Sequence, residues 1–515
     1  MTRLRWTDLL NSNRFSTSLR PPVKGRPREP DWLVKDRTEL ERDFDRILFS
    51  TPMRRLGDKT QVFPRERNES VRNRLTHTHE VTNLARSVAN FIVHRELGKK
   101  IAEELGGDEN ALRRMRRDIP ALLTAISAAH DLGNPPFGHQ GENAIRAWIK
   151  RHENSLFDCV PSTALNEQHD DEPFSDTFRK DFLLFEGNAQ TLRVVTRLQV
   201  VDDDLGLNLC YATIAALMKY TVSSDEIVPK GRNAALRKVG YFQSEKKIVE
   251  TARNACGLPH GVRHPLTFIM EACDDVAYSV LDAEDAVKKQ IVSFSDVLSW
   301  LRSHQASDEL TRYVFEHSEF DYQRHRTAGL SPAELNDVSM QKFRVYSINA
   351  MMSAVIRAFC DNYEQIMNCA FETDLISASK AARFAEALKE FDSLHAYRNY
   401  RVRGLELEGF NVINGLMDFL WRGITEREDF SDLSSKRTTP FASYVYSRIS
   451  ENYRRVFEQT SLNRYRTDDP SLPIRYRELQ LLTDMVSGMT DEYAVDLYNE
   501  LRAYHVGASE ARPAK

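Results

Sequence analysis

A short stretch from His130 to Glu142 holds the densest set of side chains in this chain that could do chemistry. It opens with the pair His130-Asp131, bends through glycines and prolines, and then presents His139 and Glu142. Histidine and aspartate are common ligands of divalent cations. A His and a Glu three residues apart share a helix face and can exchange a proton. The stretch therefore predicts a metal-binding pair followed by a proton-transfer pair.

Glu142 has a second explanation, because the helix dipole alone favours a carboxylate in the first turn of a helix. That explanation does not account for His139 beside it. If the helix begins near His139, both side chains lie on one face and can be hydrogen-bonded.

A second histidine lies on a predicted amphipathic helix further upstream. Its buried positions recur at helical steps: His77, Val81, Leu84, Val88 and Ile92. His77 should therefore point inward, whereas His79, about 200° around the helix, should face elsewhere. A hydrogen-bonded core histidine would explain His77 equally well if this helix is considered alone.

The segment before His130 is a helix over residues 121–129, apolar on every face and hence central. Asp118 and Pro120 have the residue types of an N-cap and a first turn for it, and Gly133 should stop it. His130 and Asp131 then lie in the last turn of a buried helix. An unpaired carboxylate there is costly to desolvate, and a bound cation would offset that cost.

A third helix, starting near residue 265, carries another acidic residue on an apolar stripe. Asp274 falls in phase with Met270 and Leu281, whereas Asp275 lies one step around on a polar line with Asp282. Spacing thus favours Asp274 over Asp275 as the inward-facing carboxylate.

His77, His130, Asp131 and Asp274 together predict a metal site. Two neutral imidazoles and two carboxylates give a site of charge about −2 that suits one divalent cation. The mixed nitrogen and oxygen set fits Mn²⁺, Co²⁺, Fe²⁺, Ni²⁺ or Zn²⁺, and Mg²⁺ if waters complete an octahedron. The six cysteines form no C-x-x-C pair, so neither a disulfide framework nor a thiolate zinc site is indicated.

Composition indicates a globular, cytoplasmic protein. Hydrophobic residues make up 41% of the 515 residues and charged residues 28%, with no apolar run long enough to span a bilayer and no apolar signal region at the start. The formal net charge of −4 argues against wholesale attraction to nucleic acid, although arginines are dense near the N-terminus.

The pattern along the chain predicts an all-α fold, because helical spacing recurs and no strand alternation of useful length is present. Residues 1–35, rich in Pro, Arg and Ser, are expected to form an extended arm. A catalytic core is expected over 36–300, with irregular insertions near 151–181 and 229–264. A C-terminal helical part is expected over 301–515.

The H…HD…D order resembles the signature of the HD-domain phosphohydrolase superfamily, an all-helical fold. The surrounding sequence makes the resemblance specific to the bacterial deoxyguanosinetriphosphate triphosphohydrolases (dGTPases), from about Phe44 to the segment Ser487-Gly488-Met489-Thr490-Asp491. The matching motifs are Lys59-Thr60-Gln61-Val62-Phe63-Pro64, Asn73-Arg74-Leu75-Thr76-His77, the segment His130 to His139, Phe185-Glu186-Gly187-Asn188-Ala189-Gln190, and Asp274-Asp275-Val276-Ala277-Tyr278.

This resemblance implies hydrolysis of a deoxynucleoside triphosphate, preferably dGTP, at the α-phosphorus, with release of the deoxynucleoside and intact triphosphate. It implies Mg²⁺, Mn²⁺ or Co²⁺ on His77, His130, Asp131 and Asp274. His139 would protonate the leaving 5′-oxygen or otherwise shuttle the proton, and Glu142 would orient it.

The resemblance also implies a nucleotide pocket. Its expected members are Gln61 and Val62 at the base and sugar, Asn188 and Lys219 on the phosphate side, Tyr220 and Tyr278 as stacking or sugar-floor residues, Asp282 at the sugar, and Glu406 as a guanine-reading carboxylate, with Glu408 as its alternative. Tyr278 would crowd a ribose 2′-hydroxyl and favour deoxy substrates.

The resemblance also implies a homo-oligomer, with a hexamer as the expected size. The C-terminal helical part over 301–515 would complete the nucleotide pocket and the oligomer contacts. Single-stranded DNA could modulate the activity through the basic N-terminal region. Two other functions remain open at this point. One is an HD-type phosphodiesterase or nucleotidase acting on other nucleotides, which would release different products. The other is a nucleic-acid-binding regulatory protein.

Overall fold

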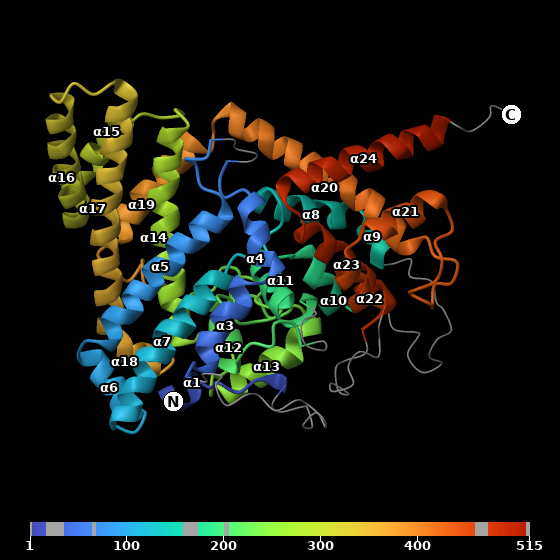
Figure 1. Cartoon of the computed structure of the whole chain (residues 1–515), viewed down its shortest axis with the longest axis horizontal. Coiled ribbons are helices and arrows are strands. Elements are labelled where there is room, and N and C mark those ends of the chain that lie inside the picture. Colours follow the sequence, from blue (N-terminus) through green and yellow to red (C-terminus); the bar gives the residue numbers. More distant parts are fainter. Residues whose placement is uncertain are drawn as a thin grey trace.

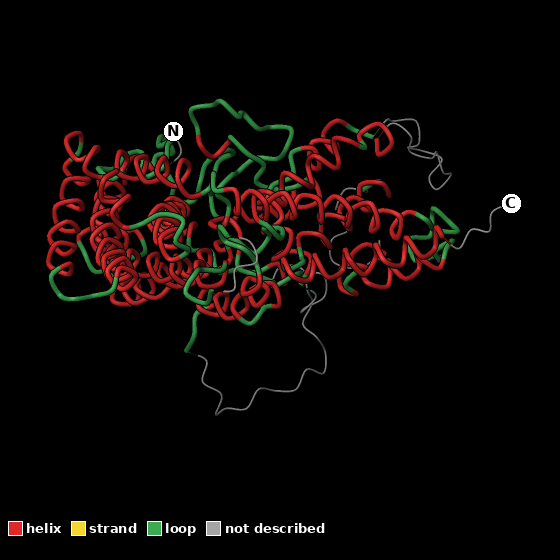
Figure 2. The backbone as a smooth tube through the Cα atoms, turned by 90° about the horizontal axis from the view of Figure 1, so that it is seen from above, coloured by secondary structure: helices red, strands yellow, loops and turns green. Residues whose placement is uncertain are grey.

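The computed structural model describes residues 3–16, 36–63, 68–157, 174–199, 205–458 and 472–510. Across these ranges the chain is helical, and only isolated β-bridges occur in place of strands. Figure 2 shows helices throughout, joined by loops. The predicted all-α class is confirmed. No helix in the described ranges has both the length and the apolar character needed to cross a membrane.

The helices of the first half are α1 (Trp6–Leu9), α3 (Glu39–Leu48), α4 (Thr51–Arg55), α5 (Arg74–Val93), α6 (Glu96–Glu104), α7 (Glu109–Ala129), α8 (Gly138–Arg151), α9 (Glu153–Phe157), α10 (Asp176–Leu183), α11 (Gly187–Arg193), α12 (Tyr211–Leu217) and α13 (Lys246–Ala255). Those of the second half are α14 (Pro265–Lys288), α15 (Phe294–His304), α16 (Glu309–Arg326), α17 (Pro332–Asp361), α18 (Tyr363–Met367), α19 (Ala382–Phe391), α20 (Tyr400–Thr425), α21 (Pro440–Arg448), α22 (Glu451–Glu458), α23 (Ile474–Ser487) and α24 (Asp491–Glu510).

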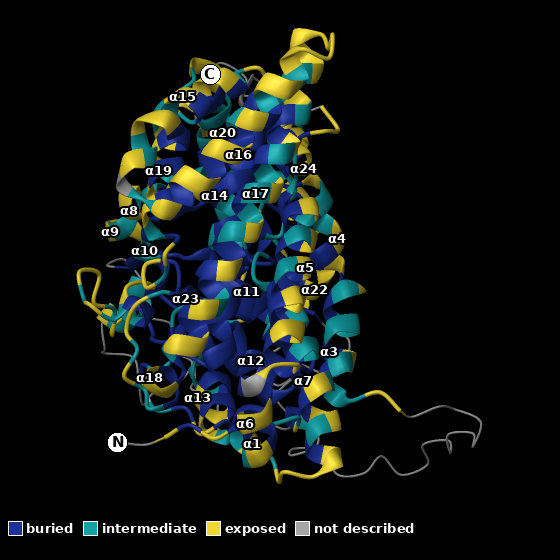
Figure 3. Cartoon of the chain, turned by 90° about the vertical axis from the view of Figure 1, so that its left-hand side faces the viewer, coloured by how far each residue is buried: buried dark blue, intermediate teal, exposed yellow. Residues whose placement is uncertain are grey.

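Three long helices, α5, α7 and α14, pack against one another at the centre and carry or adjoin the predicted metal ligands. Helices α15 to α17 lie on one side of them in Figure 1, and α20 to α24 with α8 lie on the other. Buried residues run along α11, α12 and α14 in Figure 3. One continuous apolar cluster extends from Leu4 to Leu501, so the C-terminal helices share the core of the first half.

Helix α5 starts with a capping box in which the Asn73 and Thr76 side chains each accept a hydrogen bond from the other's backbone amide. His77 therefore sits in the first turn with a fixed phase. Val81, Val88 and Ile92 are buried below it, as the helical spacing predicts.

The start of α7 differs from the prediction. The helix begins at Glu109, capped by Asp108, and passes through Pro120, so Asp118 is not an N-cap. A proline inside a helix costs roughly 3 kcal/mol because it removes a hydrogen bond and crowds the preceding turn. The preceding turn of α7 includes Arg116, which is exposed to solvent. Burial of the apolar face along the whole helix stabilises α7 by more than Pro120 costs.

The N-terminal prediction is wrong for residues 3–16, and residues 17–35 lie outside the described ranges. Leu4, Trp6 and Leu9 are buried in the core, and the Trp6 indole donates a 2.7 Å hydrogen bond to the Tyr363 hydroxyl. The apolar residues spaced along this stretch hold it in the core despite its polar composition. The two predicted insertions also contain helices, namely α9 and α10 in the first and α13 in the second.

A buried arginine anchors the C-terminal end of α11 to α23. Arg193 donates two 2.7 Å hydrogen bonds to the Asp484 carboxylate and a third, of 3.0 Å, to Glu245. All three side chains are almost fully buried. The anchor holds α11, whose first residue contacts the predicted proton-transfer pair.

We expect Arg193→Ala to lower the free energy of unfolding by about 3–5 kcal/mol, because it leaves two buried carboxylates without a cationic partner. Urea denaturation followed by circular dichroism measures the change. Arg116→Ala, at an exposed position of α7, is the matched control and should be neutral. Equal denaturation midpoints for the two variants would contradict the anchor.

Candidate active site

The structure brings His77, His130, Asp131 and Asp274 together where α5, the end of α7 and α14 meet. The Nε2 atom of His77 lies 3.0 Å from Oδ1 of Asp274. Nε2 of His130 lies 3.6 Å from the same oxygen and 3.7 Å from Oδ1 of Asp131. Ligand atoms of His77, His130 and Asp131 all lie within 4.8 Å of one another. Atoms that each bind one ion at about 2.0–2.3 Å have this spacing.

The imidazole of His130 is oriented for a ligand. Its Nδ1 atom lies 2.6 Å from the Ser127 carbonyl oxygen, which accepts the Nδ1 proton. That bond leaves the lone pair on Nε2, which is buried and has no hydrogen-bond partner among the described residues. An orphaned imidazole nitrogen beside two carboxylates fits a divalent cation.

The carboxylate of Asp131 is held from both sides. Arg74 donates to Oδ2 at 2.5 Å, and the Asn134 amide donates to Oδ1. Arg74 belongs to one of the motifs that carry the family resemblance, but no role was predicted for it. Its position three residues before His77, on the same side of α5, was the available signal.

The charges of the cluster compensate one another. Burial lowers the pKa of His130, but the carboxylates of Asp131 and Asp274 outweigh burial and raise that pKa to about 9. Burial likewise acts to raise the pKa of Asp274, yet His130 and His77 hold it well below its usual range. Burial also acts to raise the pKa of Asp131, but Arg74 and His130 hold it below its ordinary value. Both carboxylates therefore stay charged, and a bound cation would take the place of the proton on Nε2 of His130.

The two ambiguities in the ligand set are resolved by orientation. Asp274 faces the two histidines, whereas Asp275 turns to Lys389, whose Nζ lies 3.1 Å from its carboxylate. His77 is buried, whereas His79 is exposed on the opposite side of α5. The helix phase predicted both orientations.

The turn after Asp131 leads directly into α8. Phe137 adopts a left-handed conformation, with φ of 60°, and the helix starts at Gly138. Nδ1 of His139 lies 3.3 Å from Oε2 of Glu142. The His139 side chain is 82% exposed and the Glu142 side chain 4%, so the imidazole reaches outward from a buried carboxylate.

Glu142 is fixed by neighbours on α11 and α8. The Gly187 amide donates to Oε1 at 2.8 Å, and Arg146 lies 3.8 Å from Oε2. Burial acts to raise the pKa of Glu142, but the bond with His139 and these neighbours hold it below the ordinary value. A Cβ at position 187 would lie 2.2 Å from Oδ1 of Asn134 and 2.8 Å from Oε1 of Glu142, so a larger residue there would displace these side chains.

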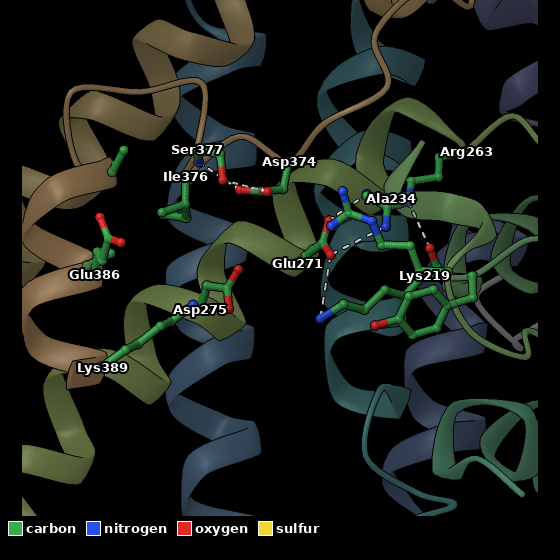
Figure 4. A pocket seen from close by; sticks show the side chains of 14 residues that line it. Lys219, Ala234, Arg263, Glu271, Asp275, Asp374, Ile376, Ser377, Glu386 and Lys389 are labelled. Atoms are coloured by element: carbon green, nitrogen blue, oxygen red, sulfur yellow. Dashed lines mark hydrogen bonds and ion pairs between the residues drawn. The ribbon is translucent and has the colours of Figure 1, made fainter. Parts of the chain in front are cut away.

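A polar cavity of about 520 Å³ opens beside α14 (Figure 4). Lys219, Tyr220, Asp275 and Lys389 are among its lining residues. Nζ of Lys219 lies 3.5 Å from a carboxylate oxygen of Glu271, on the face of α14 that also carries Asp275. Lys219 and Tyr220 thus lie in one hollow, on the side of α14 that carries Glu271 and Asp275.

Asn188 belongs to a group centred on the buried carboxylate of Glu186. The Asn188 amide donates to Glu186 at 3.0 Å, and Lys238 donates to the same oxygen at 3.1 Å. Lys238 also lies over the ring of Tyr220, 5.7 Å from its centroid. Lys238 is a cation near the predicted phosphate side that sequence reasoning missed.

Tyr278 and Asp282 meet a residue that sequence reasoning did not identify. The Tyr397 hydroxyl lies 2.5 Å from Oδ2 of Asp282 and 2.9 Å from the Tyr278 hydroxyl. Tyr397 also packs in a small apolar cluster with Val62. Oε1 of Gln61 is buried and has no hydrogen-bond partner within the described ranges. No local pattern marks Tyr397, since it lies on an irregular π-turn between α19 and α20.

Glu406, on α20, is bonded to the side chain of Gln140, the residue after His139. Both Glu406 and Glu408 are partly buried. The interaction with Gln140 places Glu406 beside α8.

We expect His77→Ala to lose bound divalent metal and His79→Ala to retain it, because only His77 faces the carboxylates. Metal content after dialysis, measured by inductively coupled plasma mass spectrometry, gives the comparison. Metal loss in the His79 variant with retention in the His77 variant would overturn the ligand set.

No protein-family model matches the chain. Among curated proteins, it is 31% identical to the deoxyguanosinetriphosphate triphosphohydrolase-like protein of Listeria innocua over 499 residues, which is 97% of this chain and 99% of that protein. It is 34% identical to the deoxyguanosinetriphosphate triphosphohydrolase of Salmonella paratyphi A and 33% identical to that of Salmonella arizonae, each over 90% of this chain and 93% of the relative. Similarity at this level spans nearly the whole of each protein. The chain belongs to the deoxyguanosinetriphosphate triphosphohydrolase family.

Proposed function

We propose that this protein hydrolyses deoxynucleoside triphosphates, with dGTP preferred, to the deoxynucleoside and inorganic triphosphate. One observation carries the proposal: a single turn joins His130 and Asp131, which could hold a metal ion together with His77, to the hydrogen-bonded pair His139-Glu142. The names of the relatives support the same substrate and products. The helical fold and the H…HD…D cluster support membership of the HD phosphohydrolase superfamily.

His77, His130, Asp131 and Asp274 would hold the divalent ion, Mg²⁺, Mn²⁺ or Co²⁺. When bound, such an ion supplies stabilisation of negative charge on the α-phosphate and makes water more acidic. Arg74 and Asn134 keep Asp131 oriented towards this position. The chain thus contributes a fixed, pre-formed ligand set.

The proton chemistry falls to His139. Its Nδ1 is engaged with Glu142, so Nε2 is the atom available to donate a proton to the departing 5′-oxygen. Glu142 stays ionised in its buried position and stabilises the imidazolium form. An exposed imidazole on a buried, anchored carboxylate can accept a proton from solvent and deliver it to the leaving group.

The substrate would lie between the cavity and the Tyr278 side of α14. Lys219 and Asn188 would contact the polyphosphate, and Tyr220 would be a stacking or sugar-floor residue. Gln61, Val62, Tyr278 and Asp282 would contact the nucleoside, and the buried, unpartnered Oε1 of Gln61 offers an acceptor for a polar ligand group. Glu406, next to α8, would contribute to guanine preference.

We further propose that the protein is a cytoplasmic homo-oligomer, with a hexamer as the expected size, and that single-stranded DNA modulates its activity. Its domains would be a catalytic core over 36–300 and a completing helical part over 301–515.

We expect chromatography of reactions with each of the four deoxynucleoside triphosphates, and with GTP as the ribonucleotide control, to show deoxynucleoside and tripolyphosphate as products. dGTP should react fastest, GTP slowest, and chelation of the divalent ion should stop all reactions. Release of inorganic phosphate or pyrophosphate in place of tripolyphosphate would instead support a nucleotidase or phosphodiesterase.

We expect His139→Ala to lower kcat by about 10²–10⁴-fold, the usual contribution of a general acid or base, without loss of bound metal. Steady-state kinetics on dGTP together with metal analysis test this separation. His94→Ala, an exposed histidine at the end of α5, is the matched control. A His139 variant with wild-type kcat would remove this residue from the proton pathway.

A further inference from the structure

Two segments of the site converge on one carboxylate in the C-terminal part of the chain. Asp491, the first residue of α24, accepts hydrogen bonds at Oδ2 from the Thr60 amide, at 3.1 Å, and from the Thr60 hydroxyl. At Oδ1 it accepts a 3.0 Å hydrogen bond from the Phe137 amide. Asp491 is only 3% exposed, so these three donors take the place of water.

The two segments have different parts in the proposed reaction. Thr60 directly precedes Gln61 and Val62, on the nucleoside side. Phe137 directly precedes α8, which carries His139 on the proton side. One carboxylate therefore fixes the distance between the segment that binds the nucleoside and the helix that moves the proton.

The backbone at Phe137 needs an external restraint. A residue with a side chain in the left-handed region costs roughly 1–2 kcal/mol, so the turn keeps this conformation only where contacts hold it. One contact is the bond from its amide to Asp491. Another is the packing of its ring on Gly409 of α20, where a Cβ would come within 2.5 Å of the ring.

Lys59 makes a second tie between the same elements. Its buried ammonium donates to the Asn134 carbonyl at 2.6 Å and to the Ser487 carbonyl at 2.7 Å. The segment containing Thr60 is thereby bound to the catalytic turn and to the end of α23. Asp491 supplies the carboxylate of this arrangement.

We propose that Asp491 is a positioning residue that holds the nucleoside-binding segment, residues 60–62, and the start of α8 in register for hydrolysis. Asp491 does not touch the metal ligands or His139, so it acts through Thr60 and Phe137. This inference rests on the proposed function.

Asparagine at position 491 should break one half of the contact selectively. Its single carbonyl oxygen can face only one side, and the two donors of Thr60 outweigh the one donor of Phe137. The amide NH₂ would then face the Phe137 N–H, donor against donor. The start of α8 would be released while the nucleoside-binding segment stays in place.

The test compares Asp491→Asn with Asp496→Asn, the same change at an exposed position of α24. We expect Asp491→Asn to lower kcat for dGTP by about 10–100-fold, the effect of a small misplacement of a catalytic group, with KM changed less than about threefold. Metal content should match that of the control, and the melting temperature should fall by no more than a few degrees, because one buried hydrogen bond is lost. Thr60→Val, which loses only the hydroxyl donor, should raise KM more than it lowers kcat.

Hydrogen–deuterium exchange separates this role from general stability and from the proposed reaction. In Asp491→Asn, amides of residues 137–142 should exchange faster while those of α5 and α14 stay unchanged. Wild-type kcat and unchanged exchange in Asp491→Asn would overturn the proposal, as would acceleration throughout the chain. If the wild-type protein releases no tripolyphosphate, the proposed function fails, and the exchange pattern still decides whether Asp491 holds both segments.

Discussion

The structure depends on two partly buried carboxylates, Asp131 and Asp274, at the meeting point of three central helices. Carboxylates in such surroundings are stable only with cationic or hydrogen-bonding partners. His77, His130, Arg74 and the Asn134 amide supply them. The helices α5, α7 and α14 must keep their relative rotation for these partners to meet. The long apolar faces of the core therefore have a second role, which is to fix the phase of a few polar atoms.

The turn between α7 and α8 divides the chemistry of the site. His130 and Asp131 on one side belong to the cluster that could hold a metal ion, and His139 with Glu142 on the other side forms a pair whose imidazole is exposed. This division requires the chain to pass very close to α11, which explains the glycine at position 187. The same close approach lets the Gly187 amide hold Glu142, so packing and proton chemistry share one contact.

Periodicity in the sequence was enough to predict the all-α class, the inward face of His77 and the choice of Asp274 over Asp275, because helix phase is a local property. Periodicity gave wrong predictions where contacts between distant segments determine the structure. Pro120 lies within α7 although its residue type suits a helix start, and residues 3–16 enter the core although their composition suits an arm. Tyr397, Lys238 and the contacts of Asp491 were not predictable, since they join segments that no spacing rule relates.

The contacts of Asp491 also have a consequence for biosynthesis. They join positions 354 and 431 residues apart in the chain. At roughly 5–20 residues per second, a ribosome adds Asp491 about 20–70 seconds after Phe137. During that interval the metal ligands from α5, α7 and then α14 can already assemble, but the turn before α8 lacks its carboxylate partner. The nascent chain would thus bring its histidines and carboxylates together well before the turn ahead of α8 gains the carboxylate that restrains it.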